Sequence, residues 1–122
     1  MISLEYDSTY LYGLGMECFE KNELQKALGF FQKSIEIEPH FKTYERMFVC
    51  FNKLGSRIEA KECIKRAFQL NDKNDKVTVE YVSILIEENS IDEAVLVLND
   101  LLKRNPTYGP AKKLLDKINP QI

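Results

Sequence analysis

Residues 27–39 read ALGFFQKSIEIEP, and the same pattern returns twice further along the chain. Each copy begins with alanine, and large apolar residues follow four and eight positions later. The copies are Ala27, Phe31 and Ile35; Ala60, Ile64 and Phe68; and Ala94, Leu98 and Leu102. Twelve positions after the alanine stand Pro39, Asp72 and Pro106. A period of about 34 residues indicates an array of stacked structural repeats.

The residues around these aligned positions predict two antiparallel helices in each copy. Apolar residues recur at spacings of three, four and seven, which places them on one face of a helix. Asn22, Gly55 and Asn89 stand five residues before the alanines. Asparagine and glycine tolerate the left-handed conformation that ends a helix, so the paired helices should separate there. The expected helices span residues 8–21, 24–37, 41–54, 57–70, 75–88, 91–104 and 110–118.

The alanine column predicts where paired helices touch, because two helix backbones approach closely only over a small side chain. We therefore expect Ala60 to be buried. The expected apolar stripe of its helix is Ile58, Ala60, Ile64, Ala67 and Phe68.

The C-terminal segment predicts a covering helix. Gly109 and Pro110 mark a helix start, since proline is tolerated in the first turn. The apolar stripe that follows is Ala111, Leu114, Leu115 and Ile118. A terminal repeat needs a cover with a polar outer face, and this helix is expected to supply it.

Composition narrows the function classes. The 122 residues carry a net charge of −2, so no basic footprint for nucleic acid is indicated. Apolar runs are too short for a membrane span, and we expect no signal peptide. Cys18, Cys50 and Cys63 are too few for a disulfide framework. They are expected to be small core residues in a reduced, cytoplasmic protein.

Catalytic and metal-binding patterns are not apparent. His40 is the only histidine, and we expect it to be a solvated turn residue. No Cys-x-x-Cys pair suggests zinc. Residues 71–76 lack the glycine of a calcium loop. We expect no enzyme activity, cofactor or metal.

The chain resembles the tetratricopeptide repeat family. The family pattern, W-x2-L-G-x2-Y followed by A-x3-F, a small residue and P, is best matched in the first copy. The matching residues are Leu11, Leu14, Gly15, Cys18, Ala27, Phe31, Ser34 and Pro39. The resemblance implies an all-α fold, a right-handed superhelical array of three helix-turn-helix repeats. The repeats would span 8–40, 41–74 and 75–108, with a capping helix in 109–122, all in one domain over 1–122.

In that family, partners usually bind the concave face, which is lined by the first helix of each repeat. The resemblance therefore implies a non-catalytic protein–protein interaction module. The positions implied to contact a peptide are Tyr12, Met16, Phe19, Lys42, Glu45, Val49, Asn52, Lys76, Val79 and Ser83. Because these include charges of both signs, we expect salt to weaken binding only modestly.

Alternatives remain beside this interpretation. Tyr12, Met16 and Phe19 could instead pack against residues 1–7. The chain could be a self-associating scaffold joined through Tyr10 and Leu11, or a regulatory module of a larger assembly.

One specialised partner of the family is not expected. Chaperone-binding members grip a C-terminal carboxylate through a set of lysine, asparagine and arginine residues. The matching positions here are Tyr12, Met16, Arg46, Lys76 and Glu80, of which only Lys76 agrees. We therefore expect no binding of a chaperone tail.

Overall fold

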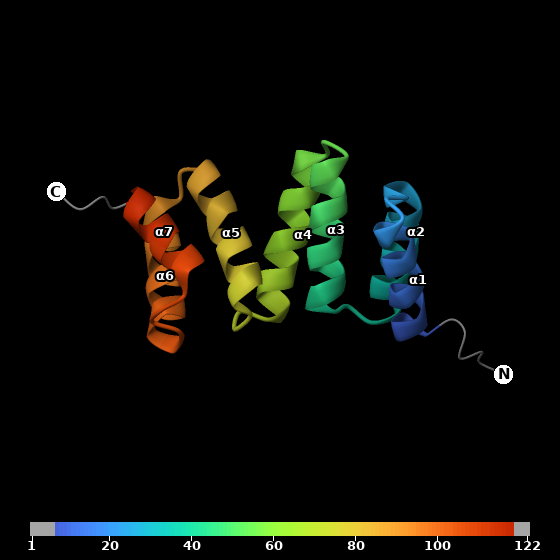
Figure 1. Cartoon of the computed structure of the whole chain (residues 1–122), viewed down its shortest axis with the longest axis horizontal. Helices are drawn as coiled ribbons and strands as arrows, with labels where there is room; N and C mark the ends of the chain where they lie inside the picture. The colour runs from blue at the N-terminus through green and yellow to red at the C-terminus, as the bar shows by residue number, and fades with distance from the viewer. Residues whose placement is uncertain (1–6, 119–122) are drawn as a thin grey trace. The chain divides into compact units, whose positions relative to one another are not determined.

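The structure is a computed structural model that describes residues 7–118. Over this range it contains seven α-helices and no strand (Figure 1). The helices are α1 (Ser8–Glu20), α2 (Leu24–Ile37), α3 (Phe41–Lys53), α4 (Arg57–Leu70), α5 (Asp75–Glu87), α6 (Ile91–Arg104) and α7 (Gly109–Ile118). The expected all-α fold is confirmed, and each helix boundary falls within one residue of its predicted place.

The turns inside the three helix pairs share one backbone geometry. Asn22, Gly55 and Asn89 have φ angles of 61°, 79° and 62°, as expected for left-handed helix ends. After α1, the N–H of Glu23 donates to the Cys18 carbonyl at 2.8 Å, and that of Asn22 donates to the Phe19 carbonyl at 3.0 Å. This is the Schellman hydrogen-bond pattern, and it recurs after α3 and α5.

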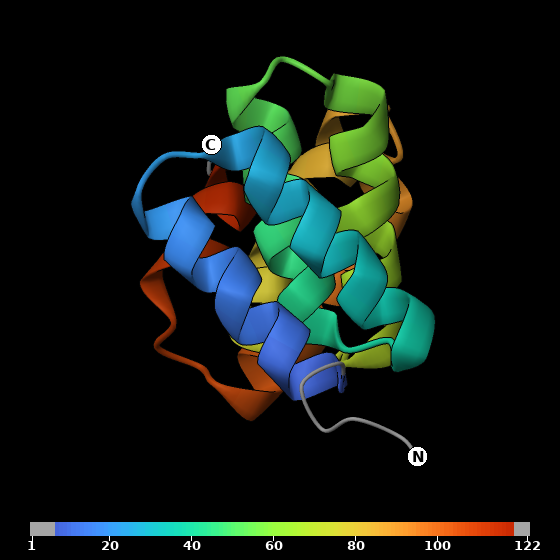
Figure 2. The ribbon, with the colours of Figure 1, turned by 90° about the vertical axis from the view of Figure 1, so that its right-hand side faces the viewer.

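The chain divides between Leu70 and Asn71 into two compact units. The first contains the helix pairs α1–α2 and α3–α4, and the second contains the pair α5–α6 with α7. Figure 2 shows α1 and α2 side by side in the first unit.

The core of the first unit depends on small residues at helix contacts. Ala27 and Ala60 are both fully buried. A Cβ on Gly15 would lie only 2.5 Å from Cε1 of Phe31, so only glycine fits beside that ring without a shift. The buried Ser34 hydroxyl donates to the Ser8 carbonyl at 2.8 Å, which ties α2 to the start of α1.

One residue of the expected stripe on α4 lies elsewhere. Ile58 is 77% exposed, whereas Ala60 is fully buried. Residues two positions apart point to nearly opposite sides of a helix. Burying Ala60 therefore turns Ile58 to the surface.

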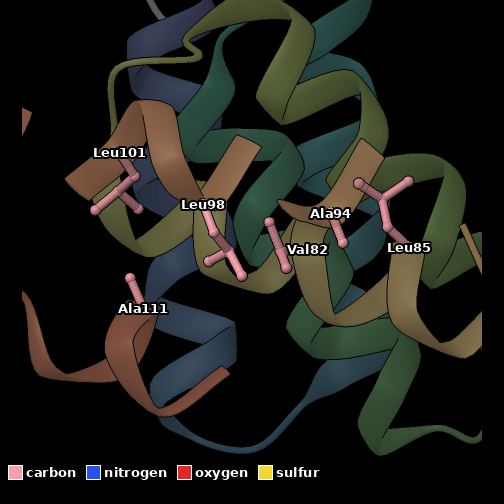
Figure 3. Close-up of a cluster of buried hydrophobic side chains, with 6 residues drawn as sticks. All are labelled: Val82, Leu85, Ala94, Leu98, Leu101 and Ala111. Carbon is pink, nitrogen blue, oxygen red and sulfur yellow. The ribbon is translucent and has the colours of Figure 1, made fainter. Parts of the chain in front are cut away.

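The second unit is built on a cluster closed by α7. The cluster consists of Val82 and Leu85 of α5, Ala94, Leu98 and Leu101 of α6, and Ala111 of α7 (Figure 3). Leu114, Leu115 and Ile118 pack against this cluster. The predicted role of the C-terminal helix as a cover for the last helix pair is confirmed.

The cysteines differ in burial. Cys50 and Cys63 are buried, as expected, and burial raises the pKa of Cys50 to about 11 and that of Cys63 to about 12. Cys18 is only partly buried, contrary to the prediction. Cys18 lies in the last turn of α1, and the two residues that follow this helix, Lys21 and Asn22, are exposed, so the thiol lies near the surface of the unit.

None of the helices in the described part of the chain has the length and apolar character needed to cross a membrane.

Candidate functional site

Two neighbouring helices of the first unit present contrasting rows of side chains. On α1, Tyr12, Met16 and Phe19 follow one another at spacings of four and three, and all are partly exposed. On α3, the matching row is Lys42, Arg46, Val49 and Lys53. Such spacings place residues on one side of a helix. We call these seven residues the α1–α3 face.

At the N-terminal ends of the two helices, the rows border a pocket of about 220 Å³. Tyr12 and Lys42 both line it. The other lining residues are Ser8, Thr9, Glu38, His40 and Thr43. Hydroxyl, carboxylate, imidazole and ammonium groups therefore surround one concave site beside the aromatic ring of Tyr12.

His40 has a role that sequence reasoning missed. Its Nδ1 accepts a hydrogen bond from the backbone N–H of Lys42 at 3.1 Å, which makes it the N-cap of α3. Its ring also stacks on Phe41, with centroids 5.0 Å apart. Its place directly before an apolar-periodic run was the available signal, although serine, threonine, aspartate and asparagine are the usual N-caps.

Towards the C-terminal end of α1, cations from α3 cover an aromatic ring. The Arg46 guanidinium carbon lies 5.5 Å from the centroid of the Phe19 ring, and Lys53 Nζ lies 5.3 Å from it. Both distances are in the range of cation–π attraction. The α1 and α3 rows are thus linked through the pocket at one end and through Phe19 at the other, so the two helices run in the same direction along the face.

Glu45, an expected contact residue, is only 5% exposed. Its Oε1 lies 3.4 Å from Nε of Arg46, so the carboxylate pairs with the guanidinium that covers Phe19. The surface of α3 therefore does not carry the mixture of positive and negative charges that was expected for it. Lys42 and Lys53 are exposed, whereas the acid between them is buried.

Asn52 is engaged within the first unit. Its Oδ1 accepts a hydrogen bond from Nη1 of Arg57 at 2.6 Å. This contact brings the positive charge of the first residue of α4 to the end of α3. Val49 remains partly exposed between Arg46 and Lys53.

The remaining expected contact residues lie on α5 in the second unit. Lys76 is exposed, and Val79 and Ser83 are partly exposed. The Ser83 hydroxyl donates to the Val79 carbonyl at 3.1 Å, so it bonds within its own helix.

Within residues 7–118, no group of three or more His, Cys, Asp or Glu side chains is placed to hold a metal. The raised pKa values of Cys50 and Cys63 leave little thiolate near neutral pH, and the thiolate is the nucleophilic form.

Comparison with protein families adds a sequence match to this geometry. The family model described as tetratricopeptide repeat matches residues 8–41, which contain α1 and α2. No curated protein sequence matches the chain.

Solved tetratricopeptide domains share the fold over nearly the whole chain. The OM64 domain of Arabidopsis is 19% identical, with a TM-score of 0.72, and the match covers 94% of this chain and 96% of that one. The first domain of Spaghetti (RPAP3), bound to the HSP90 peptide SRMEEVD, is 17% identical, with a TM-score of 0.74 and coverage of 96% and 93%.

The second domain of human RPAP3, in complex with the HSP70 peptide SGPTIEEVD, is 16% identical, with a TM-score of 0.73 and coverage of 93% and 96%. The resemblance to the tetratricopeptide repeat family is thereby confirmed: the chain has the tetratricopeptide fold, with three helix pairs and a capping helix.

Proposed function

We propose that this tetratricopeptide-repeat chain is a non-catalytic interaction module that binds a peptide or protein segment on the α1–α3 face. The observation that carries the proposal is the row of Tyr12, Met16 and Phe19, which stays partly exposed beside a pocket. Aromatic and thioether side chains supply contact area that suits an apolar anchor. Two domains of similar fold were solved with bound peptides, which supports the same class of partner here.

The other expected contact residues take different parts in this proposal. Val49 and Asn52 would flank the ligand on α3, and Glu45 would act indirectly by holding Arg46. On α5, we propose Lys76, Val79 and Ser83 as contacts made by the second unit.

We further propose that the module does not grip a chaperone tail by its terminal carboxylate. Such a grip needs converging cations and amide donors, and Tyr12 and Met16 occupy two of the required positions. The test is to measure binding of SRMEEVD with a free and with an amidated C-terminus. Equal affinities are expected, and a clear preference for the free carboxylate would contradict this part of the proposal.

Self-association is less well supported as the alternative. Tyr10 is 47% exposed, but Leu11, the second residue expected in such a contact, is buried. Sedimentation over a range of concentrations distinguishes the two functions, because a binding module remains monomeric where a scaffold does not.

The central test is a pair of substitutions on the face. Tyr12→Ala combined with Phe19→Ala is expected to reduce capture of the native partner about tenfold or more, since both remove aromatic contact area. Lys33→Glu, on the exposed side of α2, is the control and should retain capture. Circular dichroism checks that helicity is intact. Full capture by the double variant, with loss in Lys33→Glu, would contradict the proposal.

A further inference from the structure

We infer that the α1–α3 face takes an acidic peptide segment, with carboxylate side chains against the cations of α3 and intervening apolar side chains against the aromatic row of α1. This inference rests on the proposed function and specifies the chemistry of the partner.

Charge is the first argument. The chain as a whole carries a net charge of −2, yet Lys42, Arg46 and Lys53 form a single row on α3. The acid in that stretch, Glu45, is buried against Arg46 rather than displayed. Arg57, whose Nη1 donates a hydrogen bond to Asn52 Oδ1, adds a further positive charge at the end of the row. A local row of cations on an acidic protein favours a ligand of negative charge.

The acids near the face restrict where the carboxylates bind. Glu38 lines the pocket beside Lys42, and Glu20 is exposed at the end of α1. Both would repel an acidic side chain placed near them. The strongest anchoring is therefore expected in the middle of the face, at Arg46, and on the α3 side at Lys53.

Phe19 and Glu45 prepare Arg46 for this role. The ring lies 5.5 Å from the guanidinium carbon, and the Glu45 carboxylate is 3.4 Å from Nε. An arginine has five N–H donors. Because Glu45 lies at Nε of Arg46, the two terminal NH2 groups of the guanidinium can donate to a carboxylate of the ligand. A guanidinium that is held in one orientation can bind a carboxylate through two parallel hydrogen bonds.

Spacing supports an extended ligand. Lys42 and Arg46 are four residues apart, or about 6 Å along a helix axis. Alternate side chains of an extended chain are about 6.6 Å apart and point to the same side, while those between them point to the other. Because α1 and α3 flank the face in the same direction, one edge of such a ligand meets cations and the other meets Tyr12, Met16 and Phe19.

The probe is therefore a peptide of about seven alternating glutamates and leucines, acetylated and amidated so that neither terminus is charged. The matched control replaces every glutamate with glutamine. Fluorescence anisotropy of the labelled peptides with the full chain is expected to show about tenfold tighter binding of the glutamate peptide in low salt. Raising the salt to about 0.5 M should remove most of that preference, because the Debye length shortens.

Substitutions then locate the charge effect. Lys42→Gln combined with Lys53→Gln should weaken the glutamate peptide about tenfold and leave the glutamine peptide unchanged. Lys26→Gln combined with Lys33→Gln removes the same charge from exposed positions on α2 and should leave both affinities within about twofold.

The possible failures are distinguishable. Equal binding of the two peptides, or equal losses in the two double variants, overturns the inference. If the two peptides bind equally but Tyr12→Ala combined with Phe19→Ala abolishes their binding, the proposed function stands, and only the preference for an acidic ligand is lost. If the glutamate peptide does not bind and the aromatic variant captures the native partner normally, both the inference and the proposed function fail.

Discussion

The first and third helix pairs fill the same repeat position with different side chains. In α1–α2, Gly15 lies against the ring of the buried Phe31. In α5–α6, the equivalent residues are Val82 and Leu98, which are both fully buried in one cluster. A small residue thus accompanies a large one in the first pair, and two residues of medium size meet in the third. The two pairs therefore share a well-filled contact between their helices, although the residues that fill it differ.

The two units also complete their cores differently. In the first, one helix pair follows another, whereas in the second a single helix, α7, packs on the cluster through Ala111. The second unit therefore completes its core with one helix, where the first unit uses a helix pair.

The largest expected effect comes from deleting residues 109–122. The deletion removes Ala111 and the contacts of Leu114, Leu115 and Ile118 with the cluster. Full burial of a large aliphatic side chain is worth about 1.5–3 kcal/mol, so losing three partly buried ones should cost about 3–5 kcal/mol. Urea denaturation measures the loss. Hydrogen exchange should show it chiefly in α5 and α6, and unchanged protection there would mean that α7 does not stabilise this unit.

Gly15→Val should be the most damaging single substitution in the first pair. Overpacking typically costs about 1–3 kcal/mol, and the upper end is expected because the added atoms would meet the buried Phe31 ring. Combining Gly15→Val with Phe31→Leu recreates the side chains of the third pair and should recover part of the loss in thermal melting. If the double variant is less stable than Gly15→Val alone, the two pairs do not share the compensation inferred above.

Ala60→Leu should destabilise the second pair by about 1–3 kcal/mol, because it adds atoms to a contact that is already filled. Ile58→Ala is the matched control two residues away, where an exposed position should change stability by only about 0.5 kcal/mol. Chemical denaturation of both variants tests the register of α4. Similar losses at the two positions would show that the register is wrong.

A smaller difference is expected between two helix starts in the second unit. The Asn74 side chain accepts a hydrogen bond from the Val77 N–H at 3.0 Å, while Ser90 makes no such side-chain bond at the start of α6. Asn74→Ala should therefore cost about 1 kcal/mol, and Ser90→Ala clearly less. Thermal melts of the two variants compare the caps, and an equal cost would mean that the observed bond contributes little.

The helices were predictable because their signals are local. Each pair ends its first helix at a residue that accepts a left-handed φ, and the apolar stripes lie within single helices. The burial of Ala27, Ala60 and Ala94 followed from their small size together with their shared position in the repeat.

The features that were not predictable arise between helices. Glu45 is polar and stands at a position expected to face a ligand, yet it is buried, with Arg46 among its partners. The cover of Phe19 by Arg46 and Lys53 likewise depends on how α1 lies against α3. Sequence spacing places residues on a helix face but does not show which side chain of the next helix reaches across.

The unequal burial of the thiols gives the chain a built-in chemical reporter. Cys18, Cys50 and Cys63 all belong to the first unit, and only Cys18 is partly exposed. A maleimide dye added to the native protein should therefore attach to one sulfur, and the other two should become reactive only when α3 and α4 come apart. Mass spectrometry of the number of dyes bound would follow the opening of this unit over time in wild-type protein, with no engineered label.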